Sequence, residues 1–399
     1  MARSVGALPF LDHGAGEFAA DPHRCLRATR EQSPIARTPT GVGVLSYAGC
    51  SAVITDPDFR PGVFEMVRRA SPDGATARTG RTMLGSEGED HQQLRRAVTP
   101  WFTPRRIEAL RARTAALVDD LVVAAGTDGG CEFMVDVANP IPPTVFCWMV
   151  GCDVERGPEL RHWSSIALQA FSGDPSVMQD VAVAIRALRR FADELIEQKQ
   201  RTPGSDLTSA LLEAVTRRDL VLDDVRSLLT ELLSASVDNT THAMGLALWL
   251  LARHPDEWSA VARGLAPVDR AVEECARFEP VIRHGNHFAT RDLELLGVEV
   301  SEGTLVTVYL ASAHRDPAAY DRPEEFSVVR RPAHPQLQFG IGRHHCIGAA
   351  LARMEIQEVV GAVITRWEAP GIGPGARVET AVTGEVHALP VEFEVRALS

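Results

Sequence analysis

The ten residues 339–348 constrain this chain more than any other segment. They read FGIGRHHCIG and lead directly into a helical pattern. Gly340 and Gly342 permit a tight turn and the close approach of a flat molecule. Cys346 lies where the loop enters the helix, and free backbone N–H groups at a helix N-terminus favour a thiolate over a thiol. The segment therefore predicts a loop that presents one reactive sulfur.

Two neighbours strengthen this interpretation of Cys346. Phe339 can shield the sulfur from water, and Gly348 removes a side chain where a macrocycle could lie against the backbone. The other six cysteines are scattered, and no CxxC pair or zinc spacing occurs. We expect those six to be small buried hydrophobic residues in a reducing compartment.

Helical patterns dominate the rest of the chain, and β-branched segments lie toward its two ends. A helix beginning at Thr103-Pro104 and a very long one over 222–254, closed by Pro255, are the clearest patterns. We expect one domain over residues 1–399, mainly α with a small β region. The further expected helices cover 140–152, 156–171, 177–199, 205–215, 267–279 and 347–367, and the strand-rich segments cover 37–56, 287–310 and 380–396.

The charge and hydrophobicity of the chain exclude several classes of partner. A net charge of −12 argues against a nucleic-acid partner and against an anionic membrane surface. The longest apolar run, residues 243–252, has about half of the ~20 residues that a membrane span requires. The first residues contain no convincing signal peptide. We expect a cytoplasmic protein.

The 339–348 loop resembles the cysteine loop of the cytochrome P450 family at every fixed position, and the resemblance extends over about residues 20–395. It implies the cytochrome P450 fold, with haem b (iron protoporphyrin IX) between the long oxygen-activating helix and the helix after the cysteine loop. The resemblance makes Cys346 the iron ligand and places Phe339, Gly340 and Gly348 around the cofactor. The chain is most similar to the soluble bacterial branch.

A second match to the family is Glu274-Cys-Ala-Arg277. A Glu and an Arg at i,i+3 are often only a solvated surface pair. In the family this pair is buried under the cysteine loop, and Arg330 would complete its network. The resemblance gives Glu274, Arg277 and Arg330 a structural role without chemistry.

Polar residues in three segments match the haem-propionate contacts of the family. His91 and Arg95 lie one helical turn apart and so share a helix face. Two such donors suit a carboxylate, and His344 is the matching donor beside the cysteine. The family usually has an arginine where this chain has His287, which could still donate a hydrogen bond.

The oxygen-activating helix departs from the family pattern of alanine, glycine, any residue, acid and two threonines. The chain has Ala235-Ser-Val-Asp238-Asn239-Thr240. Asp238 matches the acid that relays protons during oxygen activation, whereas Asn239 is a poor proton relay. A water or substrate hydroxyl could complete the relay, Thr240 could swing in, or the reaction could need less exacting proton delivery, as in aryl coupling. A surface Asp is the alternative for Asp238.

The substrate is poorly specified by the sequence. In the family the pocket is lined by segments equivalent to 61–85, 165–180, 234–239, 282–286 and 384–387. The resemblance therefore points to Ser234, Ile282, Arg283 and Asn286 as pocket residues. Arg283 could instead be a surface cation. If it points inward, a polar or carboxylate-bearing substrate is favoured.

The resemblance implies a monooxygenase that inserts one atom of O₂ into a small organic substrate. Electrons would come from NAD(P)H through ferredoxin reductase and ferredoxin, and the protein would be a monomer. A possible docking face for ferredoxin is a basic cluster. It contains Arg95, Arg96, Arg105, Arg106, Arg343 and Arg353. Two alternatives remain open, which are oxidative aryl or C–C coupling at the same haem and a non-catalytic haem-binding protein.

Overall fold

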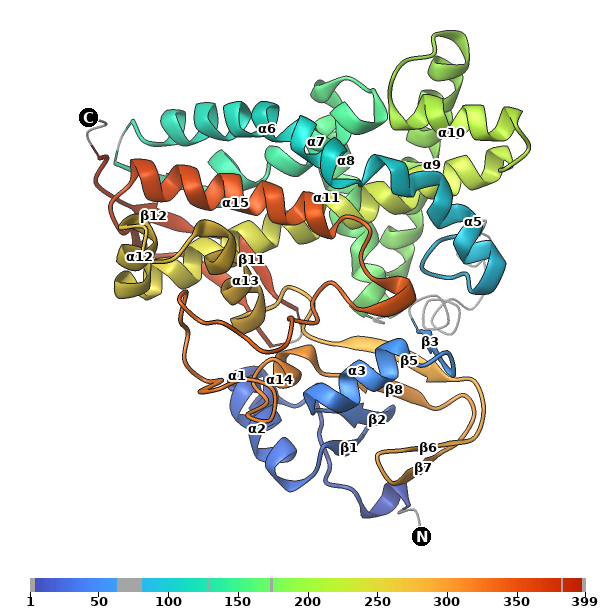
Figure 1. Cartoon of the computed structure of the whole chain (residues 1–399), viewed down its shortest axis with the longest axis vertical. Coiled ribbons are helices and arrows are strands. Elements are labelled where there is room, and N and C mark those ends of the chain that lie inside the picture. The colour runs from blue at the N-terminus through green and yellow to red at the C-terminus, as the bar shows by residue number, and fades with distance from the viewer. Residues whose placement is uncertain (1–3, 63–80, 128, 173–174, 382, 397–399) are drawn as a thin grey trace.

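Helices form most of the molecule, and its largest sheet lies toward one end (Figure 1). The structure is a computed structural model that describes residues 4–62, 81–127, 129–172, 175–381 and 383–396. In Figure 1 the helices α5 to α11 and α15 occupy the upper part, and the blue N-terminal strands and orange strands occupy the lower part. This arrangement is the predicted mainly α fold with a small β region.

One helix, α11 (Leu222–Arg253), runs through the helical part and contacts most of the other long helices. The Asp224 carboxylate accepts a hydrogen bond from the Val221 N–H at its start, and the helix ends just before Pro255, as predicted. Helices α7, α8, α9, α13 and α15 pack against it. Nineteen of its residues are buried, so α11 is a core helix that other helices surround.

The helices that follow the expected patterns lie close to the predicted boundaries. Their bounds are α6 (Pro104–Ala125), α7 (Ile141–Val150), α8 (Gly157–Leu168), α9 (Met178–Arg201), α10 (Leu207–Thr216), α13 (Val268–Phe278) and α15 (Ala349–Arg366). The remaining described helices are α1 (Gly16–Ala20), α2 (Pro22–Gln32), α3 (Tyr47–Thr55), α5 (Gly88–Val98), α12 (Pro255–Ala262) and α14 (Leu310–Ala313). Pro104 opens α6 because a proline at the first helical position loses no hydrogen bond.

The largest sheet joins strands from two distant segments, residues 35–61 and 285–308. Its order is β1 (Ile35–Thr38), β2 (Gly41–Val44), β8 (Leu305–Val308), β5 (Gly285–Ala289) and β3 (Phe59–Pro61). β2 and β8 pair in parallel, and the other pairs are antiparallel. β6 (Leu293–Leu295) and β7 (Val298–Val300) form a separate hairpin.

One part of the β prediction is wrong. Residues 47–55 lie within the predicted strand-rich segment 37–56 but form helix α3. The Ser46 side chain caps that helix by accepting from the Gly49 N–H, and Cys50 and Val53 bury one face in the core. A cap and an i,i+3 apolar pair thus outweigh the β-branched residues of the segment.

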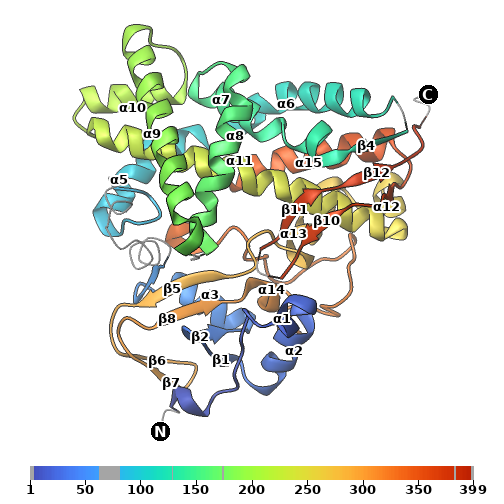
Figure 2. The same ribbon diagram turned by 180° about the vertical axis from the view of Figure 1, so that it is seen from behind.

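The C-terminal strands lie against the helical part. β12 (Pro390–Glu392) pairs with β4 (Gly130–Glu132) and β9 (Gly371–Ile372), and β10 (Arg377–Glu379) pairs with β11 (Glu385–Ala388). Figure 2 shows β10 and β11 beside α11. In the described parts of the chain, no helix is long and apolar enough to cross a membrane.

Candidate haem-thiolate site

The cysteine loop is a tight turn that ends at the start of α15. Gly340 and Gly342 have φ values of +64° and +73°, a region that favours glycine. The Cys346 N–H donates to the Phe339 carbonyl over 2.8 Å and closes the turn. Arg353 from the first turns of α15 stacks over the Phe339 ring at 4.2 Å. The loop is therefore fixed by its own backbone and by the helix that follows.

The Cys346 sulfur faces the N-terminus of α15. The residue is exposed to solvent, and yet burial among surrounding protein atoms raises the pKa of its thiol. Hydrogen bonds from the Gly348 and Ala349 N–H groups and the charges of Arg95 and Arg353 act in the opposite direction. If a metal cation binds the sulfur and the thiol loses its proton, the same N–H groups would stabilise the resulting thiolate.

Four predicted polar residues converge beside this loop. The rings of His91 on α5 and His344 lie 4.6 Å apart, and Arg95 donates to the His345 carbonyl over 2.7 Å. Burial lowers the pKa of His287 on β5 to about 4, and the nearby charges of His344 and Arg343 add to this shift. These segments are distant in sequence, and the fold brings them to one place.

Two atoms of this polar cluster are buried and lack a partner among the described residues. They are Nε2 of His91 and Nδ1 of His287. Unpaired polar atoms at such depth are costly unless a ligand satisfies them. His344 differs, because its Nε2 lies 3.0 Å from a Glu87 carboxylate oxygen. The unpaired atoms fit a group with acceptor oxygens, such as a carboxylate.

Helix α11 exposes a narrow strip within an otherwise buried surface. Ala235, Asn239 and Ala243 recur at four-residue intervals and are exposed or half-buried, whereas Val237, Asp238 and Thr240 are buried. Residues four apart share one helix face. The strip leaves room beside the helix, and Asn239 lies on it while Thr240 does not.

Asp238 is a buried acid with one unsatisfied oxygen. The residue is 7% exposed, which rejects the surface alternative. Its Oδ2 lies 3.3 Å from Nε2 of His242, and its Oδ1 has no partner among the described residues. A buried carboxylate with a free oxygen is suited to exchange a proton with a water or a hydroxyl group.

Glu274, Arg277 and Arg330 form the buried network that the sequence predicted. Arg277 makes two hydrogen bonds to Glu274 of 2.8 and 2.7 Å, and Arg330 donates to the same carboxylate over 3.1 Å. Arg277 also donates to the carbonyls of His314 and Pro323. His314 in turn accepts from the Leu337 N–H over 2.6 Å, so the network reaches the start of the cysteine loop through His314.

The four residues named for the substrate pocket differ in their surroundings. Ile282 is 38% exposed. Ser234 donates to the Glu231 carbonyl, and the Asn286 side chain accepts from the Thr307 hydroxyl over 2.9 Å. Residues 63–80 and 173–174 of the predicted pocket segments lie outside the described residues.

Arg283 is neither a surface cation nor a free pocket side chain. It is 3% exposed, pairs with Glu279 and lies 3.0 Å from Nε2 of His23. The surface-cation alternative is therefore wrong, because the guanidinium is buried and forms an ion pair with Glu279. This arrangement also removes the argument for a carboxylate-bearing substrate.

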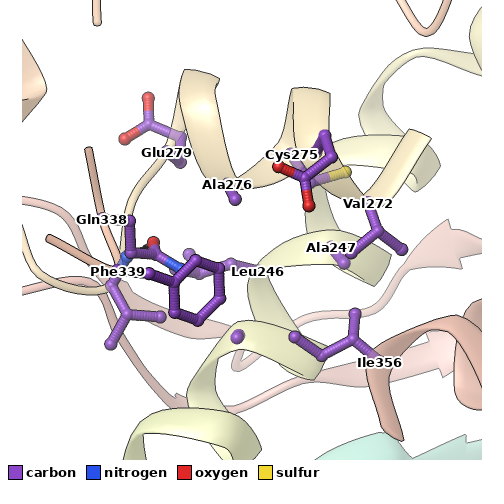
Figure 3. Close-up of a pocket in the computed structure, with 12 residues that line it drawn as sticks. Leu246, Ala247, Val272, Cys275, Ala276, Glu279, Gln338, Phe339 and Ile356 are labelled. Atoms are coloured by element: carbon purple, nitrogen blue, oxygen red, sulfur yellow. Dashed lines mark hydrogen bonds between the residues drawn. The ribbon is translucent and has the colours of Figure 1, made fainter. Parts of the chain in front are cut away.

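A small internal pocket lies behind the cysteine loop, between α11, α13 and α15 (Figure 3). Phe339 and Gln338 close one side of it, Leu246 of α11 lies beside them, and Ala247 lies toward Val272 of α13. Its lining is mainly apolar, and Glu279 already pairs with Arg283 and Arg315. The pocket borders the Phe339 side of the site but contains neither Cys346 nor Asp238.

Comparison with known proteins agrees with this geometry. The Cytochrome P450 family model matches residues 64–265 and 264–370. The solved structure of CalO2 superposes with a TM-score of 0.89 over 97% of this chain and 99% of that one, at 24% identity, and so shares the fold. The fold and the site define a haem-thiolate protein, and the chain belongs to the cytochrome P450 family.

Curated relatives specify the class of enzyme. Luteothin monooxygenase of Streptomyces thioluteus is 33% identical over 97% of this chain and 96% of its own length. The monooxygenase PikC of Streptomyces venezuelae is 33% identical over 96% of this chain and 94% of its own. The chain is a cytochrome P450 monooxygenase of the bacterial type. Membership implies a haem-thiolate cofactor, and the unpaired atoms of His91 and His287 fit its carboxylates.

Sequence reasoning missed several residues around the site. Glu231 on α11 accepts from the Met83 and Leu84 N–H groups, and Glu87 binds His344. His242 contacts Asp238 and could have been found, because the two are spaced i,i+4 on one helix. The first two contacts join distant segments and leave no such local signal.

Proposed function

We propose that this protein binds haem b and inserts one oxygen atom from O₂ into a small organic substrate. NAD(P)H supplies the electrons through a ferredoxin reductase and a ferredoxin. The proposal is supported chiefly by Cys346, an exposed residue whose sulfur faces the Gly348 and Ala349 N–H groups at the N-terminus of α15. We further propose that residues 1–399 act as one monomeric catalytic domain. The seven free thiols suit a reducing cytoplasm.

Each residue of the site has a proposed role in this reaction. Bound haem supplies the redox chemistry with O₂, and a thiolate at Cys346 donates electron density that favours O–O cleavage. His91, Arg95, His287 and His344 hold the propionates, and Phe339, Gly340, Gly348 and Ala235 contact the macrocycle. Asp238 supplies protons, and Asn239 or Thr240 holds the water or hydroxyl that receives them.

The proposed docking face for ferredoxin uses the basic cluster around the cysteine loop. Arg96, Arg105 and Arg106 are exposed. Arg343 and Arg353 are already paired with Glu87 and Glu273, which leaves the first three as the stronger attraction for an acidic partner. Electrostatic steering of this kind weakens as salt concentration rises.

The absorption spectrum of the reduced, CO-saturated holoprotein tests the haem-thiolate assignment. We expect a strongly red-shifted Soret band that is lost in Cys346→Ala. Cys25→Ala is the matched control, because Cys25 lies on α2, far along the chain from the loop. A Soret band typical of a neutral ligand in the wild-type protein would overturn the proposal. Compounds that shift the spin state of the ferric protein then identify a substrate.

Asn239 supports a second candidate reaction, which is oxidative aryl or C–C coupling. Asn239 lies on the accessible strip of α11, and its amide positions water but relays protons poorly. Product mass separates the two reactions, since coupling adds no oxygen. Asn239→Thr and Asn239→Ala test whether the residue matters. If neither variant changes the product formed per NAD(P)H consumed, Asn239 has no such role.

A further inference from the structure

Asp238 shares its buried position with a histidine that the proposed reaction has not used. His242 lies one turn further along α11, and its Nε2 is 3.3 Å from Asp238 Oδ2. The side chains of the two residues are 8% and 10% exposed. Little water reaches the contact between the acid and the imidazole, so their interaction is weakly screened.

The second nitrogen of His242 determines where its proton lies. The Val386 N–H of β11 donates to His242 Nδ1 over 3.1 Å. A nitrogen that accepts a hydrogen bond carries no proton, so the neutral ring has its proton on Nε2. That N–H is the one facing Asp238. His242 therefore meets the Asp238 carboxylate with its protonated nitrogen and cannot pass a proton onward, since its other nitrogen accepts from the Val386 N–H.

Strand β11 is held firmly enough to fix this ring. A side chain at Gly245, one turn beyond His242, would lie 3.0 Å from Val386 and 2.6 Å from Met134. A side chain at Gly384 would lie 2.5 Å from the Pro280 carbonyl oxygen. Only glycine permits these approaches. α11 and the hairpin formed by β10 and β11, the C-terminal hairpin, therefore pack closely (Figure 2), which sets the position of the Val386 N–H.

Further charged groups lie on the hairpin side of His242. His387 is 6.2 Å from His242 between ring centroids, and its Nε2 lies 3.5 Å from Glu385. The side chain of His387 is half exposed, so water can reach this face. His242, Val386 and Asp238 are themselves buried, so the two contacts of His242 are shielded from this water.

We propose that His242 is a positioning residue for Asp238. The Val386 N–H fixes the ring, the ring holds Oδ2, and Oδ1 is left oriented toward the water or hydroxyl that exchanges the proton. The inference rests on the proposed role of Asp238 in proton delivery. It adds that the C-terminal hairpin, through one backbone N–H, sets the geometry of that acid.

Nitrogen NMR of the holoprotein tests the contact directly. ¹⁵N-histidine is incorporated, the diamagnetic ferrous–CO complex is recorded, and the His242 signals are those absent from His242→Phe. We expect the Nε2–H tautomer and an Nε2 shift that moves in Asp238→Asn. The Nδ1–H tautomer, or signals that ignore Asp238→Asn, would overturn the proposal. This readout requires no turnover.

Turnover with the compound found by spin-state screening gives the second readout. His242→Phe should lower kcat about tenfold, within the about hundredfold that an ångström of misplacement can cost, while the spectroscopic Kd is unchanged. His242→Gln should recover most of the loss, because its amide can both donate and accept. Equal kcat in all three proteins, or failure of His242→Gln to exceed His242→Phe, would overturn the inference.

One control variant and one spectrum separate the possible causes of failure. His254→Phe removes a histidine just after the last residue of α11, whose Nδ1 bonds the Leu250 carbonyl rather than an acid, and it should leave kcat unchanged. The reduced CO spectrum of each variant reports whether the thiolate site has formed. A wild-type protein without the red-shifted band would refute the proposed function, whereas an intact band with unaltered His242→Phe kinetics would refute this inference alone.

Discussion

Two buried acids on neighbouring helices have opposite surroundings. Glu274 on α13 receives hydrogen bonds from Arg277, Arg330 and the Ser327 N–H. Asp238 on α11 touches His242 with one oxygen and leaves the other without a partner among the described residues. Glu274 finds hydrogen-bond donors within the folded protein, whereas one oxygen of Asp238 still lacks a donor among the described residues. The difference separates a carboxylate that builds the structure from one that is available for chemistry.

The same contrast holds around the proposed cofactor. Arg277 donates to the backbone carbonyls of His314, Pro323 and Glu325, which fixes two segments of the chain. His91 and His287 instead keep buried nitrogen atoms without protein partners. Native proteins rarely leave such atoms unpaired. At the site, the unpaired nitrogens of His91 and His287 are therefore available to a ligand, whereas the Glu274–Arg277 contacts are made within the protein.

The largest effect is expected when the scaffold is broken at Arg277. Arg277→Leu leaves Glu274 as a buried charge with fewer partners, which typically destabilises a protein by about 3–5 kcal/mol. We expect a much lower urea midpoint and little haem-loaded protein. Arg322→Leu is the control, because the pair Arg322–Glu325 is exposed and such pairs contribute about 0–1 kcal/mol. Similar midpoints for the two variants would contradict a scaffold role.

The next effect comes from replacing each of the two buried acids, Asp238 and Glu274, with its amide. Asp238→Asn keeps the shape and a contact to His242 but removes the proton-exchanging group, so turnover should fall by about a hundredfold or more. Its urea midpoint should stay near that of the wild type. Glu274→Gln should show the reverse, with a lower midpoint and a poor yield of holoprotein. If both variants lose turnover and have the same urea midpoint, the two acids do not differ in role.

The sequence predicted those parts of the site that local spacing encodes. The cysteine loop, the Glu274–Arg277 pair and the position of Asp238 on a long helix are set within a few residues of chain. Contacts between distant segments could not be predicted from spacing. The Arg283 guanidinium meets His23, which lies 260 residues away in sequence, and only tertiary packing brings them together.

The missed helix α3 and the missed role of His242 have different causes. The β-branched residues of this segment favour a strand, but the Ser46 side chain caps a helix that begins at Tyr47. His242 was visible at i+4 from Asp238, but the identity of its second partner, the Val386 N–H, depends on how the hairpin packs on α11. A helix face can be read from sequence, whereas the backbone group that approaches it cannot.

The smallest effect concerns acid, and it tests a buried histidine beside the Arg277 network. His314 accepts from the Leu337 N–H with Nε2, and its buried Nδ1 has no partner among the described residues. Burial, with the charge of Arg277, lowers the pKa of His314 to about 3 from the ordinary 6.5. Below pH 6.5 the unfolded chain therefore binds a proton that the folded protein does not, and stability falls as the pH falls.

His314→Gln should remove this contribution while keeping an acceptor for the Leu337 N–H. The wild type should lose about 1.4 kcal/mol more stability per pH unit than the variant between about pH 6 and 4. Urea unfolding at pH 7, 6 and 5 measures the difference. His334→Gln is the control, because that side chain is exposed. If the wild type and His314→Gln lose stability in parallel, His314 does not contribute to the acid sensitivity of the scaffold.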